Sequence, residues 1–339
     1  MQKTYRALVI TAPNQLDLVE RPVPVPDAAE VLIAVEACGM CGADLNDIAR
    51  VDPAGHKPRV PGHEVVGRIM ALGSAMPSIW RVGQRVGVGR LGGHCNECSL
   101  CRQGKFNLCR NQQVVGSSRD GGYAEMMLAR GTGLVSIPDE LGSAEAAPIL
   151  CAGIATFNGL KKCGAEAGDL VAILGIGGLG HMALQYARRM GFNVVAIGRG
   201  QDIADDAKAL GAHHYIDTRT ENAVEKLNQL GGAKAIVATI GHPDVVSPLI
   251  GGLAPEGRLL MLGAMKDPLA IPSGALVAGE RGIIGSITGS PYENEKALAF
   301  SVLADVRPRI ETYPLERAVE ALQRLKSGDA KFRVVLTMR

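Results

Sequence analysis

Four cysteines with short, regular gaps are the clearest chemical feature of the chain: Cys95, Cys98, Cys101 and Cys109. Their spacing, C-x2-C-x2-C-x7-C, lets one loop place four thiolates around a tetrahedral zinc ion, at about 2.3 Å each. The alternative is a set of free or disulfide-bonded surface thiols, but neighbours this close cannot easily form two unstrained disulfides. Because sulfur fills all four positions, the spacing predicts a structural zinc site.

A second set of possible metal ligands is spread along the chain and comprises Cys41, His63 and Cys151. Taken singly, a cysteine is usually a small core residue and a histidine is usually structural. Together, two thiolates and one imidazole leave a fourth position open for water or a substrate oxygen, as in a catalytic zinc site. We interpret the two remaining cysteines, Cys38 and Cys163, as core residues.

A glycine-rich motif opens the second half of the chain. The apolar run 170–174 predicts a strand, and residues 181–190 have a helical pattern. The motif between them consists of Gly175, Ile176, Gly177, Gly178, Leu179 and Gly180. In this context the glycines permit a tight turn, close approach to a pyrophosphate and packing of helix on strand. The alternative, an ordinary glycine-rich turn, does not account for the flanking elements, so the motif predicts a dinucleotide site.

The residues that follow the next predicted strand bear on the choice of dinucleotide. This strand covers residues 193–197, and Gly198, Arg199 and Gly200 come directly after it. A carboxylate at this place would bind the ribose hydroxyls and repel a 2′-phosphate. None is present, and the Arg199 guanidinium could bind phosphate in a bidentate manner. We therefore expect NADP(H) to be preferred, while NAD(H) stays possible if Arg199 points into solvent.

The elements that must position these residues indicate a protein of two domains. Strand and helix patterns alternate from the glycine motif to about residue 287, which predicts a parallel-sheet nucleotide-binding domain. The 339 residues are 47% hydrophobic and 21% charged, enough to bury a substantial core. The predicted class is α/β.

Charge and hydropathy exclude several classes of partner. With 36 Lys and Arg against 34 Asp and Glu, the net charge of +2 offers no strong field to nucleic acid or to an anionic membrane. We see no apolar signal-peptide stretch and no apolar run near the roughly 18 residues that a membrane helix needs. A cytoplasmic protein without a nucleic-acid or membrane partner is therefore expected.

With these motifs in this order, the sequence resembles the zinc-containing medium-chain alcohol dehydrogenases over essentially its whole length. The resemblance implies a β-rich, GroES-like catalytic domain that consists of residues 1–151 and 288–339 and holds both zinc sites. It implies a Rossmann domain, a doubly wound parallel sheet that binds the cofactor, at residues 152–287. It also implies a homodimer or homotetramer, and the apolar run 282–287 would suit an edge strand in such a contact.

The resemblance assigns roles to individual residues. It implies two Zn²⁺ per chain: a catalytic ion at Cys41, His63 and Cys151 with the acidic Glu64 behind it, and a structural ion at the four clustered cysteines. Asp44 matches the carboxylate that orients the zinc-bound histidine. Arg333 matches an arginine that contacts the cofactor pyrophosphate, although a surface salt bridge would be its ordinary assignment. Thr156 is expected to replace a threonine that contacts the nicotinamide.

The function implied is hydride transfer between NADP(H), or NAD(H), and a small alcohol, aldehyde or ketone. Ala43 and Asn46 depart from the family pattern, because most relatives carry Ser or Thr at the first position and often a relay His at the second. The usual proton relay is therefore absent, and a water chain could replace it. One alternative is an NADPH-dependent 1,4-reductase of α,β-unsaturated carbonyls, and another is a non-catalytic protein that binds zinc and a dinucleotide.

Arg90 is a further departure, because many microbial relatives place a large aromatic residue there to line the substrate pocket. If its guanidinium reaches the pocket, an anionic or strongly polar substrate is favoured. If Arg90 turns outward, Leu91 lines the pocket in its place.

Overall fold

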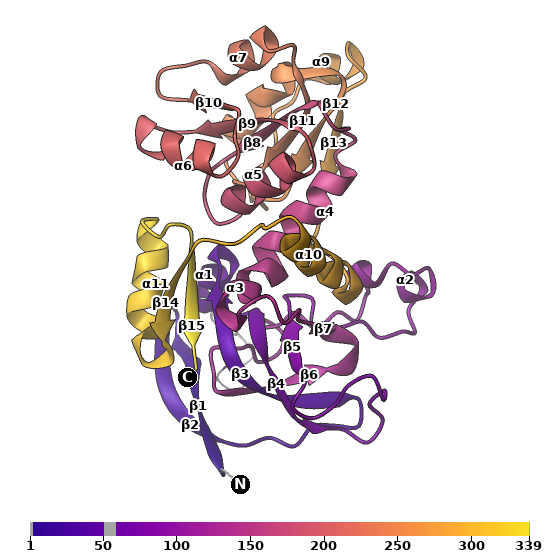
Figure 1. Ribbon diagram of the computed structural model, residues 1–339, viewed down its shortest axis with the longest axis vertical. Coiled ribbons are helices and arrows are strands. Elements are labelled where there is room, and N and C mark those ends of the chain that lie inside the picture. Colours follow the sequence, from indigo (N-terminus) through magenta and orange to yellow (C-terminus); the bar gives the residue numbers. More distant parts are fainter. Residues whose placement is uncertain (1–2, 51–58, 339) are drawn as a thin grey trace. The chain divides into compact units, whose positions relative to one another are not determined.

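The computed structural model describes residues 3–50 and 59–338 (Figure 1). The chain forms two compact units. The first unit comprises Met1–Ile154 and Gly289–Arg339, and the second comprises Ala155–Thr288. Among the described residues, no helix is both long enough and apolar enough to cross a membrane.

The first unit is built on a seven-stranded sheet. Strand order is β14-β15-β3-β4-β5-β7, and β6 also pairs with β3. These strands are β3 (Glu30–Met40), β4 (Glu64–Leu72), β5 (Arg85–Val88), β6 (Met126–Arg130), β7 (Leu134–Ser136), β14 (Ile310–Pro314) and β15 (Arg333–Thr337). A separate antiparallel pair, β1 (Thr4–Ala12) and β2 (Gln15–Pro22), packs through Leu8 and Val9 into the same apolar core.

The longest strand of this unit shows why the sheet forms. β3 carries Val31, Ile33 and Val35, whose side chains are buried, and β-branched residues of this kind pack well on a pleated surface. β3 pairs antiparallel with β4, and this register places Gly39 opposite Glu64. The end of β3 and the start of β4 therefore lie next to each other, which becomes important for the site below.

Helices complete the first unit, and two of them have clear capping residues. They are α1 (Gly42–Ala49), α2 (Ser99–Arg102), α3 (Ser143–Pro148), a π-helical turn (Ile149–Gly153), α10 (Pro291–Leu303) and α11 (Ala318–Ser327). Ser290 accepts a hydrogen bond from the Glu293 amide, and Glu293 reaches back to the Ser290 amide, so a capping box starts α10. Gly328, in the left-handed conformation, ends α11.

The second unit contains a six-stranded parallel sheet in the order β10-β9-β8-β11-β12-β13. Its strands are β8 (Leu170–Leu174), β9 (Asn193–Gly198), β10 (His214–Asp217), β11 (Ala233–Ala238), β12 (Leu253–Met261) and β13 (Gly282–Gly285). Counted from β8, the order is 3-2-1-4-5-6, that of a doubly wound dinucleotide-binding fold. The predicted α/β class with a Rossmann sheet is confirmed.

Helices connect these parallel strands. They are α4 (Ile154–Lys162), α5 (Gly180–Arg189), α6 (Ala204–Ala209), α7 (Ala223–Gln229), α8 (Pro243–Val246) and α9 (Ser273–Val277). The strand expected at residues 170–174 is β8, and the helix expected at 181–190 is α5. β13 is the last strand at one edge of the sheet, and its Ile283 is 37% exposed.

Candidate functional site

Four potential metal ligands from distant parts of the sequence meet in the first unit. One ligand atom each from Cys41, His63, Glu64 and Cys151 lies within 4.8 Å of the others, and all four residues are buried. Cys41 follows β3 and caps α1, while His63 and Glu64 stand at the start of the neighbouring strand β4. Cys151 comes from the π-helical turn. The antiparallel pairing of β3 and β4 thus brings the first three residues together.

A buried carboxylate fixes the orientation of the histidine. His63 Nδ1 lies 2.7 Å from Asp44 Oδ1. The other carboxylate oxygen of Asp44 accepts hydrogen bonds from the Cys41 amide, at 2.8 Å, and from the Tyr123 hydroxyl, at 2.9 Å. His63 Nε2 is buried without a hydrogen-bond partner. With Nδ1 engaged by Asp44, Nε2 is the nitrogen that is left to coordinate a metal.

The charges of the cluster are those of a metal site. The Cys151 thiol hydrogen-bonds to the Cys41 sulfur, at 3.9 Å, and lowers the pKa of Cys41 well below its usual range. Burial lowers the pKa of His63, but the Asp44 carboxylate and Cys41 outweigh it and raise that pKa to about 10. Two sulfurs and an imidazole nitrogen without a partner, all buried, are a donor set that zinc prefers. The residues present therefore fit the ion.

Glu64 lies behind this cluster and is paired with an arginine. Arg333, at the start of β15, donates a hydrogen bond from Nη2 to Glu64 Oε1. Arg333 is only 2% exposed, so the surface salt bridge that would be its ordinary assignment is not what the structure contains. Glu64 Oε2 is buried without a partner, and a Cβ on Gly39 would lie 2.0 Å from it. Glycine at position 39 thus leaves room for this carboxylate.

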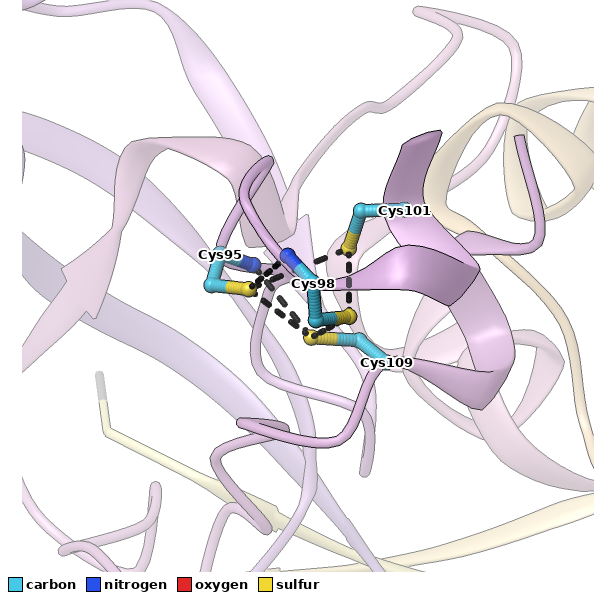
Figure 2. A group of neighbouring side chains, drawn as sticks. All are labelled: Cys95, Cys98, Cys101 and Cys109. Carbon is cyan, nitrogen blue, oxygen red and sulfur yellow. Dashed lines mark hydrogen bonds between the residues drawn. The ribbon is translucent and has the colours of Figure 1, made fainter. Parts of the chain in front are cut away.

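The second cluster is local, as Figure 2 shows. The Sγ–Sγ distances are 3.5 Å between Cys98 and Cys101, 3.6 Å between Cys95 and Cys109, and 4.0 Å between Cys95 and Cys101. Sulfurs at about 2.3 Å from a tetrahedral zinc ion would be nearly 4 Å apart, so the spacing fits the ion. All four cysteines carry free thiols.

Backbone amides prepare this loop for thiolates. The amide of Cys98 donates to the Cys95 sulfur, at 3.4 Å, and the amide of Cys95 donates to the Cys109 sulfur, also at 3.4 Å. Amides of Arg110 and Cys101 lower the pKa of Cys98 to about 6. Burial and the neighbouring thiols raise the pKa of Cys101 to about 12. Binding of a metal would therefore displace the Cys101 proton.

Arg90 also lies beside the buried cluster. It follows β5, and its Nη1 is 2.7 Å from Asp47 Oδ2 and 3.3 Å from His63 Nδ1. Sequence reasoning missed Asp47, although its place three residues after Asp44 on α1 was a signal, because that spacing puts both carboxylates on one face of a helix. It also missed Tyr123, which no spacing pattern connects to Asp44.

The relay positions hold Ala43, which is half-buried, and Asn46, which is exposed.

In the second unit, the glycine motif forms the turn between β8 and α5. Gly175 has φ +89°, a conformation that side chains rarely adopt. A Cβ on Gly180 would lie 1.8 Å from the Gly175 carbonyl oxygen, so only glycine allows this closeness of strand and helix. A Cβ on Gly177 would meet nothing within 4 Å, which leaves its backbone open to a ligand. Gly178 and Leu179 complete the turn, and Thr156 is buried in α4.

Two arginines lie at the carboxyl ends of neighbouring strands. Arg199 follows Gly198 at the end of β9 and is exposed. A Cβ on Gly200 would lie 2.8 Å from Arg219 Nη1, which places this second, exposed guanidinium next to the same loop. Asp217, the last residue of β10, is buried and accepts hydrogen bonds from the amides of Gly200 and Arg219. Sequence reasoning missed Arg219.

Comparison with known proteins agrees with this architecture. A family profile described as "Zinc-binding dehydrogenase" matches residues 178–302, and one described as "Alcohol dehydrogenase GroES-like domain" matches residues 27–139. The chain is 41% identical over 336 residues to alcohol dehydrogenase patD of Penicillium expansum, covering 99% of this chain and 98% of that protein. It is 38% identical over 335 residues to an alcohol dehydrogenase of Geobacillus stearothermophilus, covering 98% of each.

A solved structure gives the same result. Acetophenone reductase from Geotrichum candidum, in complex with NAD, aligns with a TM-score of 0.87 at 26% identity, covering 99% of this chain and 98% of that one. The relatives and the solved structure cover nearly the whole chain, and the two profiles cover most of it. The protein is therefore an oxidoreductase that belongs to the zinc-containing medium-chain dehydrogenase family.

Proposed function

We propose that this protein transfers a hydride between NADP(H) and a small alcohol or the corresponding aldehyde or ketone, with the help of zinc. The observation that carries the proposal is the buried set of Cys41, His63 and Cys151, in which His63 Nε2 lacks a partner while Asp44 holds Nδ1. A buried imidazole nitrogen without a hydrogen-bond partner, within reach of two thiols, is one that a bound ion would satisfy.

Each residue of the cluster has a distinct role in this proposal. Cys41, His63 and Cys151 would hold zinc, which supplies Lewis-acid chemistry toward an alcohol or carbonyl oxygen. Asp44 fixes the orientation of the His63 ring, because its carboxylate accepts a hydrogen bond from Nδ1 and so directs Nε2 to the ion. Glu64 could supply a fourth ligand through Oε2, which has no partner, while Arg333 holds Oε1.

The four clustered cysteines, Cys95, Cys98, Cys101 and Cys109, would bind the second zinc ion. Their sulfurs are close enough to surround one ion and leave no position for a substrate. Backbone amides already donate hydrogen bonds to the sulfurs of Cys95 and Cys109. This ion would stabilise the loop and take no part in the reaction.

NADP(H) is the preferred cofactor in this proposal. The exposed Arg199 and Arg219 guanidiniums border the loop after β9, where the 2′-phosphate of the cofactor would lie. Asp217, at the end of β10, is buried and occupied by two backbone amides, so it does not take the place of a ribose-binding acid. The exposed Asp202 carboxylate also borders this loop, 2.5 Å from where a Cβ on Gly200 would lie, and the two arginines outnumber it there. Gly175, Gly177, Gly178, Leu179 and Gly180 would hold the pyrophosphate, and Thr156 of the same unit would contact the nicotinamide.

One observation favours a second candidate reaction. Neither Ala43 nor Asn46 supplies the hydroxyl or imidazole of the usual proton relay. Reduction of a conjugated alkene adds hydride at carbon and needs no such relay, so 1,4-reduction of α,β-unsaturated carbonyls is the alternative. A non-catalytic role in binding zinc and a dinucleotide would leave the complete ligand set of Cys41, His63 and Cys151 without a purpose.

Partners and assembly follow from the same proposal. The substrate is a small molecule, and the balanced charge of +2 gives no reason to expect nucleic acid. We propose a homodimer or homotetramer in the cytoplasm, with β13 as the contact strand, because it lies at the sheet edge and exposes Ile283.

The experiment that tests the proposal compares NADPH with NADH as reductant for aldehydes, ketones and enals, using zinc-loaded protein. The matched pair of variants is Cys41→Ser, which removes a ligand, and Cys38→Ala, which alters a buried cysteine outside the cluster. Carbonyl reduction that prefers NADPH and disappears only in Cys41→Ser supports the proposal. Saturation of enals alone would support the alternative reaction, and cofactor binding without turnover would contradict both.

A further inference from the structure

The guanidinium of Arg90 is held beside the ligand cluster of the first unit. Its Nη1 lies 3.3 Å from Nδ1 of His63, the ring nitrogen that Asp44 engages. A positive group is therefore fixed beside the imidazole whose Nε2 is left for the ion.

A buried carboxylate sets the position of this guanidinium. Asp47 Oδ2 accepts from Arg90 Nη1 at 2.7 Å, and Asp47 Oδ1 accepts from Nη2 at 3.4 Å. The Asp47 side chain is only 3% exposed, so it is anchored in α1 and cannot follow Arg90 into solvent. Two contacts from a planar group to a rigid partner preorganise the arginine.

The remaining donors of Arg90 are accessible. A guanidinium has five N–H donors, and the contacts to Asp47 use one from each terminal nitrogen. The Arg90 side chain is 24% exposed. A guanidinium beside a metal cluster, with donors beyond those that Asp47 uses, can bind an anionic group.

We propose that Arg90, positioned by Asp47, binds a carboxylate of the substrate, so that the enzyme prefers aldehydes and alcohols that carry an acidic group. The inference rests on the proposed oxidoreductase function and specifies its substrate class. A guanidinium recognises a carboxylate through charge-assisted, bidentate hydrogen bonds. Asp47 partly neutralises the guanidinium, so the preference is moderate, about tenfold in KM, with little change in kcat.

The test compares two aldehydes that differ in charge and not in shape, 4-carboxybenzaldehyde and 4-carbamoylbenzaldehyde. The corresponding 3-substituted pair varies the distance between the aldehyde and the charged group. Each gains a hydride from NADPH and a proton from water. A second readout that does not need turnover is the dissociation constant of 4-carboxybenzyl alcohol and 4-carbamoylbenzyl alcohol for the zinc-loaded protein with NADPH, measured by calorimetry.

Two variants of this pair are expected to act in opposite directions. Asp47→Asn removes the neutralising charge but keeps the size of the side chain, and should raise the preference for the carboxylate severalfold. The double variant Arg90→Gln with Asp47→Asn leaves no unpaired charge and should abolish the preference. Arg90→Lys, which keeps the charge without the planar fork, should retain part of it. Arg68→Gln, at an exposed arginine that pairs with Glu36, is the control and should change nothing.

The outcomes separate this inference from the function on which it rests. A purely structural ion pair would lower thermal stability in the variants and leave the ratio of charged to neutral ligands unchanged, and that result would overturn the inference. If no aldehyde is reduced, the proposed function fails, and the calorimetric ratio still decides the role of Arg90. If the double variant does not fold, the ratio in Asp47→Asn and Arg90→Lys decides it.

Discussion

The two cysteine clusters of this protein are assembled in different ways. Cys95, Cys98, Cys101 and Cys109 lie on one loop, and backbone amides of the same loop point at two of their sulfurs. Cys41, His63 and Cys151 come from three separate segments and are all buried. The first site needs only local chain geometry, whereas the second exists only once the sheet of the first unit has formed. We therefore expect the first to govern stability and the second to govern reactivity.

Cys41→Ser gives the largest expected effect. Loss of a thiolate ligand should lower kcat/KM at least about a thousandfold, because the ion's stabilisation of the reacting oxygen is worth several kcal/mol. Steady-state kinetics and metal analysis check this, and the protein should keep the zinc of the four-cysteine loop. Loss of both ions in this variant would contradict the independence of the two sites.

Cys101→Ser should produce the reverse pattern. Structural zinc contributes directly to folding, so we expect a loss of several kcal/mol in the free energy of unfolding and a clear fall in Tm. Calorimetry of the variant beside Cys163→Ala, a buried cysteine in the second unit, provides the check. Zinc-dependent turnover should survive at temperatures where the protein is folded. Complete loss of turnover at those temperatures would contradict the separation of a structural site from a catalytic one.

Asp44→Asn should have a smaller effect, confined to the buried cluster. The amide keeps the shape of the carboxylate but loses the charge that orients His63, and changes to such supporting groups typically cost about 10–100-fold in metal affinity or activity. Competition with a zinc chelator measures the affinity of each site. An unchanged affinity at this cluster would show that Asp44 does not position the ligand.

Tyr123→Phe should give the smallest effect. It removes one hydrogen bond to Asp44 Oδ2, while the Cys41 amide still donates to the same oxygen. The loss of about 1 kcal/mol corresponds to about fivefold in zinc affinity at the buried cluster. The same chelator competition applies, and an effect on the four-cysteine loop would be unexpected.

The same contrast explains what the sequence could predict. The four-cysteine loop and the glycine turn between β8 and α5 are encoded in short spacings, so their residues are recognisable without a structure. Alternating strands and helices also predict the parallel sheet of the second unit, whereas its doubly wound order is what the resemblance to the dehydrogenase family implies. These features depend on neighbours along the chain.

Contacts between distant residues that match no family pattern could not be predicted. Tyr123 reaches Asp44 and Arg90 reaches Asp47 only because strands and helices pack in three dimensions. The same is true of Arg333, because its place in the sequence gave no indication that β15 would bury it against Glu64. Propensity and periodicity indicate which face of a helix or strand is apolar. They do not indicate which polar side chains of two different elements will contact each other.

The central claim is that Cys41, His63 and Cys151 bind a zinc ion distinct from the one in the four-cysteine loop. Anomalous X-ray scattering at the zinc edge, from crystals of the zinc-loaded protein, tests it most directly. We predict two zinc peaks, one among the four clustered sulfurs and one between Cys41 Sγ, Cys151 Sγ and His63 Nε2. A single peak at the four-cysteine loop, with no zinc at the buried cluster, would contradict the account.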